Sequence, residues 1–205
     1  GGGAVSWRYL AVEGVDGAGK TTVAAAVVAA LEARGEEVLL VREPGGTPTG
    51  EAIRQILLHS DDSVAMWTEA MLFAASRAQL AAEVVGPALA AGVRVVSDRT
   101  VYSSLAYQGG ARELGIDPVH RVNEAGLQGV WPDRVLLLEV DPSAGLERED
   151  AADRISVEGV ALQQAVAAAY AAMAAEDPDR FVVIDASDPI DTVVAAALAA
   201  LVAHE

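Results

Sequence analysis

The stretch Gly14-Val15-Asp16-Gly17-Ala18-Gly19-Lys20-Thr21 decides the fold. It follows a short β-rich run, Tyr9–Glu13, and opens a helical stretch, Lys20–Arg34. Glycines let consecutive backbone N–H groups turn toward phosphate oxygens, and the helix N-terminus adds the positive end of a dipole. The pattern G-x-x-x-x-G-K-[ST] in this context therefore predicts a phosphate-binding loop. The alternative, a glycine turn with an incidental lysine, is disfavoured by the eight-residue match.

Strand-like and helix-like segments alternate along the whole chain. The further strand-like runs are Glu37–Arg42, Val93–Val96, Val135–Val140 and Phe181–Ile184. The helical patterns between them are Gly50–His59, Thr68–Ala91, Tyr102–Arg112, Pro118–Gln128, Glu158–Ala175 and Pro189–His204. Uninterrupted Val/Leu strands separated by helices are typical of a parallel sheet covered on both faces. We expect one doubly wound α/β domain over residues 1–205, a five-stranded parallel sheet with ligands at the carboxyl ends of its strands.

Composition excludes several classes of protein. The chain has 205 residues, of which 52% are hydrophobic, so it is not intrinsically disordered. A net charge of −16 argues against binding to nucleic acid or to an anionic membrane. The longest apolar runs are too short to span a bilayer, and the absence of cysteine fits a cytoplasmic enzyme. An anionic ligand must be held by a few placed cations, and the only lysine, Lys20, lies in the glycine-rich loop.

The loop gives a first set of candidate residues, those for ATP. We expect ATP to contact Gly14, Val15, Asp16, Gly17, Ala18, Gly19, Lys20, Thr21 and Thr22. Lys20 would reach the β- and γ-phosphates, and the Thr21 hydroxyl would coordinate Mg²⁺. The chain has no N-K-x-D guanine-binding motif, which disfavours a GTPase switch. The loop alone leaves the phosphoryl acceptor open.

Five further stretches carry a family resemblance. They are Arg42-Glu43-Pro44-Gly45-Gly46-Thr47, Gly50-Glu51-Ala52-Ile53-Arg54, Leu72-Phe73-Ala74-Ala75-Ser76-Arg77, Asp98-Arg99 with Tyr102-Ser103-Ser104-Leu105-Ala106-Tyr107-Gln108-Gly109, and Trp131-Pro132-Asp133. Together with the glycine-rich loop, these resemble the bacterial thymidylate kinases. The resemblance runs from about Tyr9 to Ala186 and implies a Mg²⁺-dependent enzyme that transfers the γ-phosphoryl group of ATP to dTMP.

The resemblance also implies an acceptor site. Its dTMP-binding residues would be Asp16, Glu43, Arg54, Phe73, Arg77, Arg99, Ser103, Ser104, Gln108 and Tyr170. Phe73 would stack on thymine and Arg77, four residues on, would donate to a base carbonyl. Arg54 and Arg99 would hold the acceptor phosphate, and Asp16 would lie near the sugar 3′-hydroxyl. Tyr170 on its alanine-rich helix has two readings, a sugar neighbour or a packing residue.

Catalysis in such a site is expected to depend on cations around the transferred group. The catalytic candidates are Lys20, Arg99, Arg148, Arg154 and Asp98, with Asp98 holding Mg²⁺ through water and Thr21 holding it directly. Residues 15–18 of the loop include no cation, so the resemblance points to a lid over about residues 147–157 for the remaining arginine. That lid is short and acidic and has Ile155-Ser156 where the family usually has Phe-Glu. Which of Arg148 and Arg154 acts in catalysis stays open, and Arg148 is also a candidate for contact with adenine.

Two alternatives stay open. Base and sugar contacts alone separate a dTMP kinase from a kinase of dUMP, UMP or CMP. A non-catalytic protein that uses its phosphate loop as a switch is disfavoured because a switch has no use for a second set of phosphate-binding arginines. The family also forms homodimers through the helices that follow the second and third strands, and the largely apolar stretch Met66–Leu89 permits such a dimer here.

Overall fold

The computed structural model describes residues 7–59, 63–148, 155 and 159–203. Its centre is one parallel sheet of five strands in the order β2-β3-β1-β4-β5. The strands are β1 (Tyr9–Gly14), β2 (Val38–Arg42), β3 (Arg94–Asp98), β4 (Arg134–Glu139) and β5 (Phe181–Asp185). All four pairings are parallel. The predicted doubly wound α/β fold is confirmed, and each strand lies within two residues of the predicted run.

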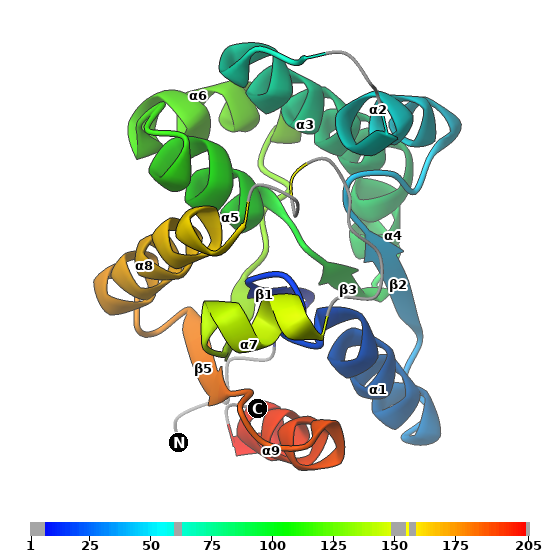
Figure 1. The fold of residues 1–205 in the computed structure, drawn as a ribbon. Helices are drawn as coiled ribbons and strands as arrows, with labels where there is room; N and C mark the ends of the chain where they lie inside the picture. The colour runs from blue at the N-terminus through cyan, green and yellow to red at the C-terminus, as the bar shows by residue number, and fades with distance from the viewer. Residues whose placement is uncertain (1–6, 60–62, 149–154, 156–158, 204–205) are drawn as a thin grey trace.

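Helices cover both faces of the sheet (Figure 1). The helices are α1 (Lys20–Ala33), α2 (Pro48–His59), α3 (Met66–Leu80), α4 (Gly86–Ala90), α5 (Val101–Ser104), α6 (Ile116–Leu127), α7 (Pro142–Glu147), α8 (Val160–Glu176) and α9 (Ile190–Ala203). In Figure 1, α1 and α9 lie below the sheet, whereas α3, α5, α6 and α8 lie above it. The core between these layers is built mainly from Val, Leu and Ala, with β1 and β4 almost completely buried.

Two predicted helices differ from the structure in the same way. The expected helix over residues 68–91 consists of α3, a π-helical segment η1 (Ala81–Val85) and α4, and the expected helix over residues 102–112 consists of α5 and a π-helical segment η2 (Leu105–Ala111). Such wide turns are frequent at functional sites, and apolar periodicity gives no sign of them. The sequence analysis also missed α7, which begins at Pro142. Asp141 caps the N-terminus of this helix, because its carboxylate accepts a hydrogen bond from the backbone N–H of Ser143 at 2.9 Å.

The strand order places the candidate residues together. The strand β1, which leads into the glycine-rich loop, and β3, which ends at Asp98, are neighbours in the sheet. The phosphate loop after β1 and residues 98–99 at the end of β3 therefore meet at one edge. The loop after β2 joins them from the other side of β3. A parallel sheet collects ligands at this edge, as the sequence analysis expected.

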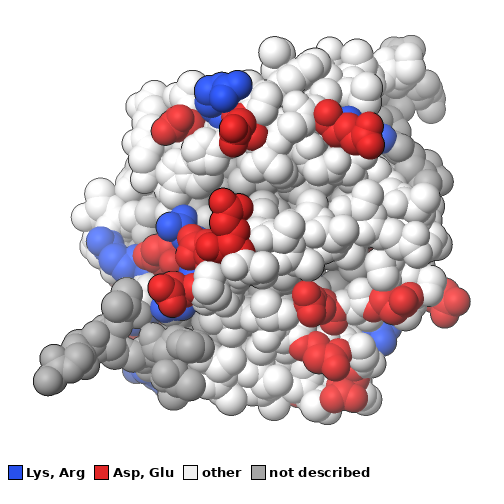
Figure 2. Space-filling view, turned by 90° about the vertical axis from the view of Figure 1, so that its left-hand side faces the viewer, with Lys and Arg blue, Asp and Glu red and all other residues white. Residues whose placement is uncertain are grey.

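On the face shown in Figure 2, acidic side chains outnumber basic ones and the basic side chains form no continuous patch. No helix in the described part of the chain is long and apolar enough to cross a membrane.

Candidate active site

The phosphate loop joins β1 to α1 and holds its lysine inward. Gly19 precedes the helix with a φ of 90°, a left-handed conformation that favours glycine. The buried Lys20 ammonium donates to the Val15 carbonyl oxygen at 2.6 Å, which folds the side chain back over the loop. Burial and the nearby Arg99 lower the pKa of Lys20 to about 8, although Asp16 and Asp98 oppose them. The Lys20 ammonium could therefore exchange its hydrogen bond to Val15 for hydrogen bonds to a bound polyanion.

A pair of oxygen donors lies at the start of α1. The Thr21 hydroxyl donates to the Asp98 carboxylate at 2.5 Å, which brings the first turn of α1 against the end of β3. Both residues line the same cavity. Hydroxyl and carboxylate oxygens are the ligands that Mg²⁺ prefers, and the described residues contain no cluster of three or more carboxylates, histidines or cysteines for a metal. These two residues therefore suit an ion that keeps most of its ligands from water and from a nucleotide.

Arg99 occupies a strained backbone position. Its φ is 69°, a conformation that a non-glycine residue rarely adopts, and its N–H donates to the Val12 carbonyl at 3.1 Å. Such strain persists where the surrounding structure enforces it, and it clusters at functional sites. The turn directs the guanidinium to Asp16, with which it forms an ion pair, and to the Ser103 hydroxyl at 3.2 Å. It also lies over the Tyr107 ring, 5.3 Å from its centroid.

Asp16 is the centre of a hydrogen-bonded network. Its Oδ1 accepts from Arg99 and from the Tyr107 hydroxyl at 3.0 Å. Its Oδ2 accepts from the Gln163 amide at 2.6 Å, and its backbone N–H donates to Gln163 Oε1 at 3.1 Å. Burial alone would raise the pKa of Asp16, but Arg99 and Lys20 hold it below its usual value. The carboxylate is therefore ionised and fixed.

A second carboxylate lies buried beneath this network. Glu13 is inaccessible to solvent, and its oxygens accept from the Thr100 N–H and hydroxyl, both at 2.7 Å, and from the Ser103 hydroxyl at 2.6 Å. The Tyr170 hydroxyl donates to it at 2.7 Å. Tyr170 is thus buried behind the site and does not line the cavity. This contact agrees with the packing interpretation of Tyr170 more directly than with a sugar contact.

Phe73 and Arg77 mark the part of the site formed by α3. Phe73 is half-buried and lines the cavity, while Arg77 is only 3% exposed and lies behind the lining. The Arg77 guanidinium donates to Glu43 at 2.6 Å, to Ser104 at 3.0 Å and to the Thr100 carbonyl at 3.0 Å. It also donates to the Asn123 side chain at 2.5 Å. Four of its five N–H groups are committed, and the fifth, on Nη2, has no partner among the described residues.

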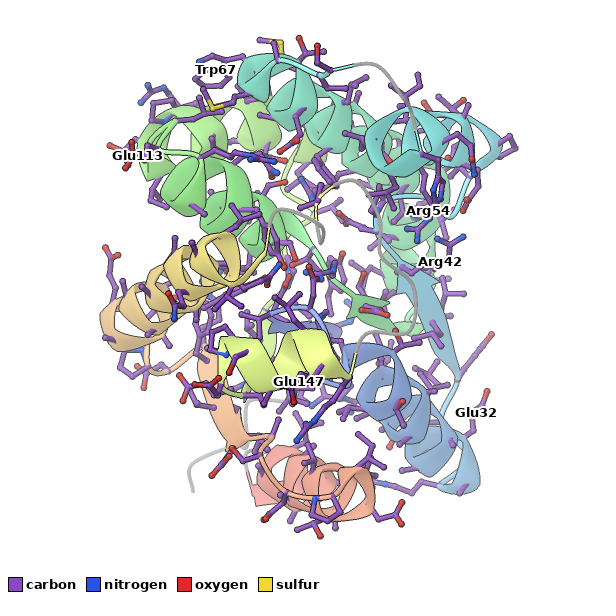
Figure 3. All side chains as sticks on the ribbon, in the orientation of Figure 1. Glu32, Arg42, Arg54, Trp67, Glu113 and Glu147 are labelled. Carbon is purple, nitrogen blue, oxygen red and sulfur yellow. The ribbon has the colours of Figure 1, made fainter. Side chains whose placement is uncertain are left out.

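The loop after β2 forms the opposite wall. Arg54 donates to the Pro44 carbonyl at 2.9 Å, and Arg42 donates to Glu51 at 2.9 Å. Figure 3 shows Arg42 and Arg54 side by side at this wall, and both line the cavity. Glu43 is buried against Arg77, and burial raises its pKa to about 7 despite that cation.

These walls enclose one cavity of about 560 Å³. It is lined by 20 residues, among them the predicted Asp16, Gly17, Gly19, Lys20, Thr21, Thr22, Glu43, Arg54, Phe73, Asp98, Arg99, Ser103, Ser104, Gln108 and Arg148. Gly14, Val15 and Ala18 are buried within the loop below it. Its lining joins Lys20 and Thr21, at the start of α1, to Phe73 on α3 and Gln108 on η2. The cavity therefore combines a cation and a hydroxyl from one element with an aromatic ring and an amide from two others.

The lid candidates are only partly described. Arg148 follows α7 and donates to the carbonyls of Ala186 and Ser187, at 3.0 and 3.2 Å, in the loop after β5. Arg154 and most of the expected lid lie outside the described residues. Gly17 in the phosphate loop and Gly145 in α7 allow the two backbones to lie in close contact. A Cβ at Gly17 would lie 1.8 Å from the Gly145 carbonyl oxygen, and a Cβ at Gly145 would lie 2.4 Å from the Asp16 carbonyl oxygen.

Sequence reasoning missed several residues of this site. They are Glu13, Arg42, Glu69, Tyr107, Arg112, Asn123 and Gln163. Glu13 had a usable signal, since a lone carboxylate in an apolar strand just before a glycine-rich loop needs a buried partner. Gln163 gave none, because an amide on an alanine-rich helix is ordinary on an exposed face.

Comparison with known proteins gives one answer. The family model for thymidylate kinase matches residues 12–197. The chain is 45% identical over 197 residues to a thymidylate kinase of Bifidobacterium longum, a match that covers 94% of this chain and 96% of the relative. It is 41% identical over 200 residues to a thymidylate kinase of Geobacillus sp., with 95% of each chain covered. The chain therefore belongs to the thymidylate kinase family.

Proposed function

We propose that the cavity transfers the γ-phosphoryl group of ATP to dTMP and so produces dTDP and ADP for dTTP synthesis. The observation that carries this proposal is that two sets of cations face one cavity from different elements. Lys20 belongs to the phosphate loop, whereas Arg99 and Arg54 come from the turn after β3 and from α2. The first set suits the phosphates of ATP and the second suits the phosphate of a nucleoside monophosphate. Phe73 at the far end offers an aromatic surface for its base.

The reaction needs alignment more than proton transfer. The second pKa of a phosphate monoester is near ~6, so the acceptor is a dianion at neutral pH and needs no general base. The obstacle is repulsion between two polyanions, and Lys20 and Arg99 neutralise it from the two sides. The ion pair with Asp16 holds the Arg99 guanidinium in place before substrate arrives. Arg99 then loses little conformational freedom on binding.

We propose Mg²⁺ as the metal that accompanies ATP. Thr21 would bind it through the hydroxyl, and Asp98 would bind it through water, since the two side chains already meet at 2.5 Å. When bound, the ion would offset the negative charge that develops on the phosphate oxygens. Arg148, Arg154 and the rest of the expected lid belong to the same proposal as sources of a further cation or of a contact with adenine.

A screen across monophosphates tests the substrate. ADP release from ATP is measured with dTMP, dUMP, UMP, dCMP and dGMP at equal concentrations. We expect a higher kcat/KM for dTMP than for dCMP or dGMP, because Phe73 and the Arg77 donor suit a pyrimidine with a carbonyl at C4. We also expect dGMP to bind less well, because a purine is larger than the pyrimidine for which the site is proposed. An equal or higher kcat/KM for dCMP would refute this assignment of the acceptor.

We also propose that the chain acts as a single kinase domain and forms a homodimer in the cytoplasm. The outward face of α3 carries the exposed apolar residues Met66, Trp67 and Met71, at 52%, 39% and 55% exposure. Figure 3 shows Trp67 pointing away from the molecule. Exposed apolar residues that lie together on one face of a helix are a mark of a protein–protein interface. Light scattering of the parent and of Met71→Asp would test it, with a monomeric parent contradicting the dimer.

A further inference from the structure

Two groups of hydrogen bonds connect α3 to the α5–η2 stretch, one on each side of Phe73. Glu69, Phe73 and Arg77 are spaced four residues apart and share one face of α3. On the facing stretch, Ser104 and Gln108 have the same spacing. Arg77 binds Ser104 at one end, and Glu69 binds Gln108 at the other. The aromatic surface thus lies between two polar bridges.

The bridge at Glu69 is buried and charged. Glu69 is only 1% exposed, and its Oε1 accepts from Gln108 Nε2 at 2.9 Å. Arg112, one turn beyond Gln108, donates to the same carboxylate at 3.2 and 3.3 Å. Both carboxylate oxygens of Glu69 accept from Arg112, and Oε1 also accepts from Gln108, so the carboxylate acts as an acceptor toward both neighbours.

This chemistry fixes which end of the Gln108 amide meets Glu69. Only the NH₂ group can donate to the carboxylate, so a flipped amide would place two acceptors against each other. Gln108 lines the cavity, and its Oε1 has no hydrogen-bond partner among the described residues. The atom left for a ligand is therefore an acceptor.

We propose that Glu69 is a positioning residue that selects the base, by holding Gln108 so that its carbonyl oxygen accepts the N3–H of a thymine or uracil ring. The inference rests on the proposed function. The other bridge complements it, because the uncommitted N–H of Arg77 suits the carbonyl at C4 of such a base. Cytosine presents a lone pair at N3 and an amino group at C4, so it mismatches both.

The experiment compares Glu69→Gln with the parent on dTMP and dCMP. A glutamine at position 69 can donate or accept, so the Gln108 amide becomes free to flip and to offer its NH₂ group to cytosine N3. We expect the ratio of kcat/KM for dTMP over dCMP to fall at least about tenfold, the effect of one lost buried hydrogen bond. The loss should lie mainly in the KM for dTMP. Glu83→Gln, at an exposed carboxylate of η1, is the matched control and should leave the ratio unchanged.

A double-mutant cycle separates positioning from a general loss of structure. Gln108→Met removes the acceptor, so adding Glu69→Gln to it should change the ratio by less than about twofold. Additive losses in the double variant, or an unchanged ratio in a folded Glu69→Gln protein, would overturn the proposal. If Glu69→Gln does not fold, Arg112→Gln replaces it, because a carboxylate without its arginine holds the amide less firmly. A ratio equal to that of the parent would then refute the role of Glu69.

The parent protein separates this inference from the proposed function. Absence of turnover with dTMP would refute the function. The ratio of the dissociation constants for dTMP and dCMP, measured by calorimetry on the parent and on Glu69→Gln, would still decide the role of Glu69.

Discussion

The titration of Lys20 gives the sharpest prediction about the phosphate loop. Burial and Arg99 lower its pKa to about 8 in the free protein. ATP binds to the ammonium form, so raising the pH through this value removes the cation before the nucleotide arrives. Above the pKa, each pH unit lowers the protonated fraction about tenfold, and kcat/KM for ATP should fall by the same factor.

Glu43 also lines the cavity, and burial raises its pKa to about 7, just below the pKa of Lys20. Burial raises the pKa values of Tyr107 and Tyr170, and the pKa of Arg99 lies well above its usual value because Tyr107 and Asp16 outweigh its burial. Arg99 and Lys20 hold the pKa of Asp16 low against the effect of its burial. Above the pKa of Lys20, the titration of Lys20 should therefore control the profile.

The assay measures initial rates at saturating dTMP and low ATP across the alkaline range. Lys20→Arg is the matched control, since a guanidinium keeps its charge there. We expect a slower variant whose kcat/KM for ATP does not fall with rising pH. A flat profile for the parent up to about pH 9.5, or an equal fall in Lys20→Arg, would refute the assignment of Lys20 as the cation that binds ATP.

Three further predictions concern neighbouring parts of the site. In Gly145→Ala, the new methyl would lie 2.4 Å from the Asp16 carbonyl oxygen, so the free energy of unfolding should fall by about 1–3 kcal/mol in urea denaturation. Arg148 bonds to the loop after β5 and is a candidate for contact with adenine, so Arg148→Ala should raise the KM for ATP and leave kcat unchanged. A fall in kcat alone would contradict this. Burial raises the pKa of Glu43 to about 7, above its pKa in the unfolded chain. Between these two pH values the folded state binds more protons than the unfolded state, so the free energy of unfolding should decrease as the pH rises through this window. Glu43→Gln should lack that slope.

The sequence predicted the sheet and the glycine-rich turn between β1 and α1 well because both depend on local patterns. Runs such as Val135–Val140 allow little but a buried strand, and the eight residues ending at Thr21 combine glycine geometry with a lysine at fixed spacing. The strand order, by contrast, follows from long-range packing. Sequence reasoning had no means of placing β1 between β3 and β4.

The missed residues share a physical feature. Glu69, Tyr107 and Gln163 act through buried polar contacts with residues far along the chain, and Gln163 lies 147 positions from Asp16. A hydropathy pattern counts such side chains as surface. The π-helical turns of η2 add to the difficulty, because they change which residues face inward after Leu105. Arg77 was identified, but its four protein partners became visible only in the folded chain.

Transfer of labelled phosphate from γ-labelled ATP tests the central claim most directly. With dTMP and Mg²⁺ present, the label should appear in dTDP, and release of free phosphate should stay far slower than transfer. Without dTMP, consumption of ATP should nearly stop, because the proposed reaction transfers the γ-phosphoryl group only to a phosphate bound at the acceptor site. Label that appears as free phosphate at the same rate with and without dTMP would contradict phosphoryl transfer in this cavity and favour a nucleotide-binding switch.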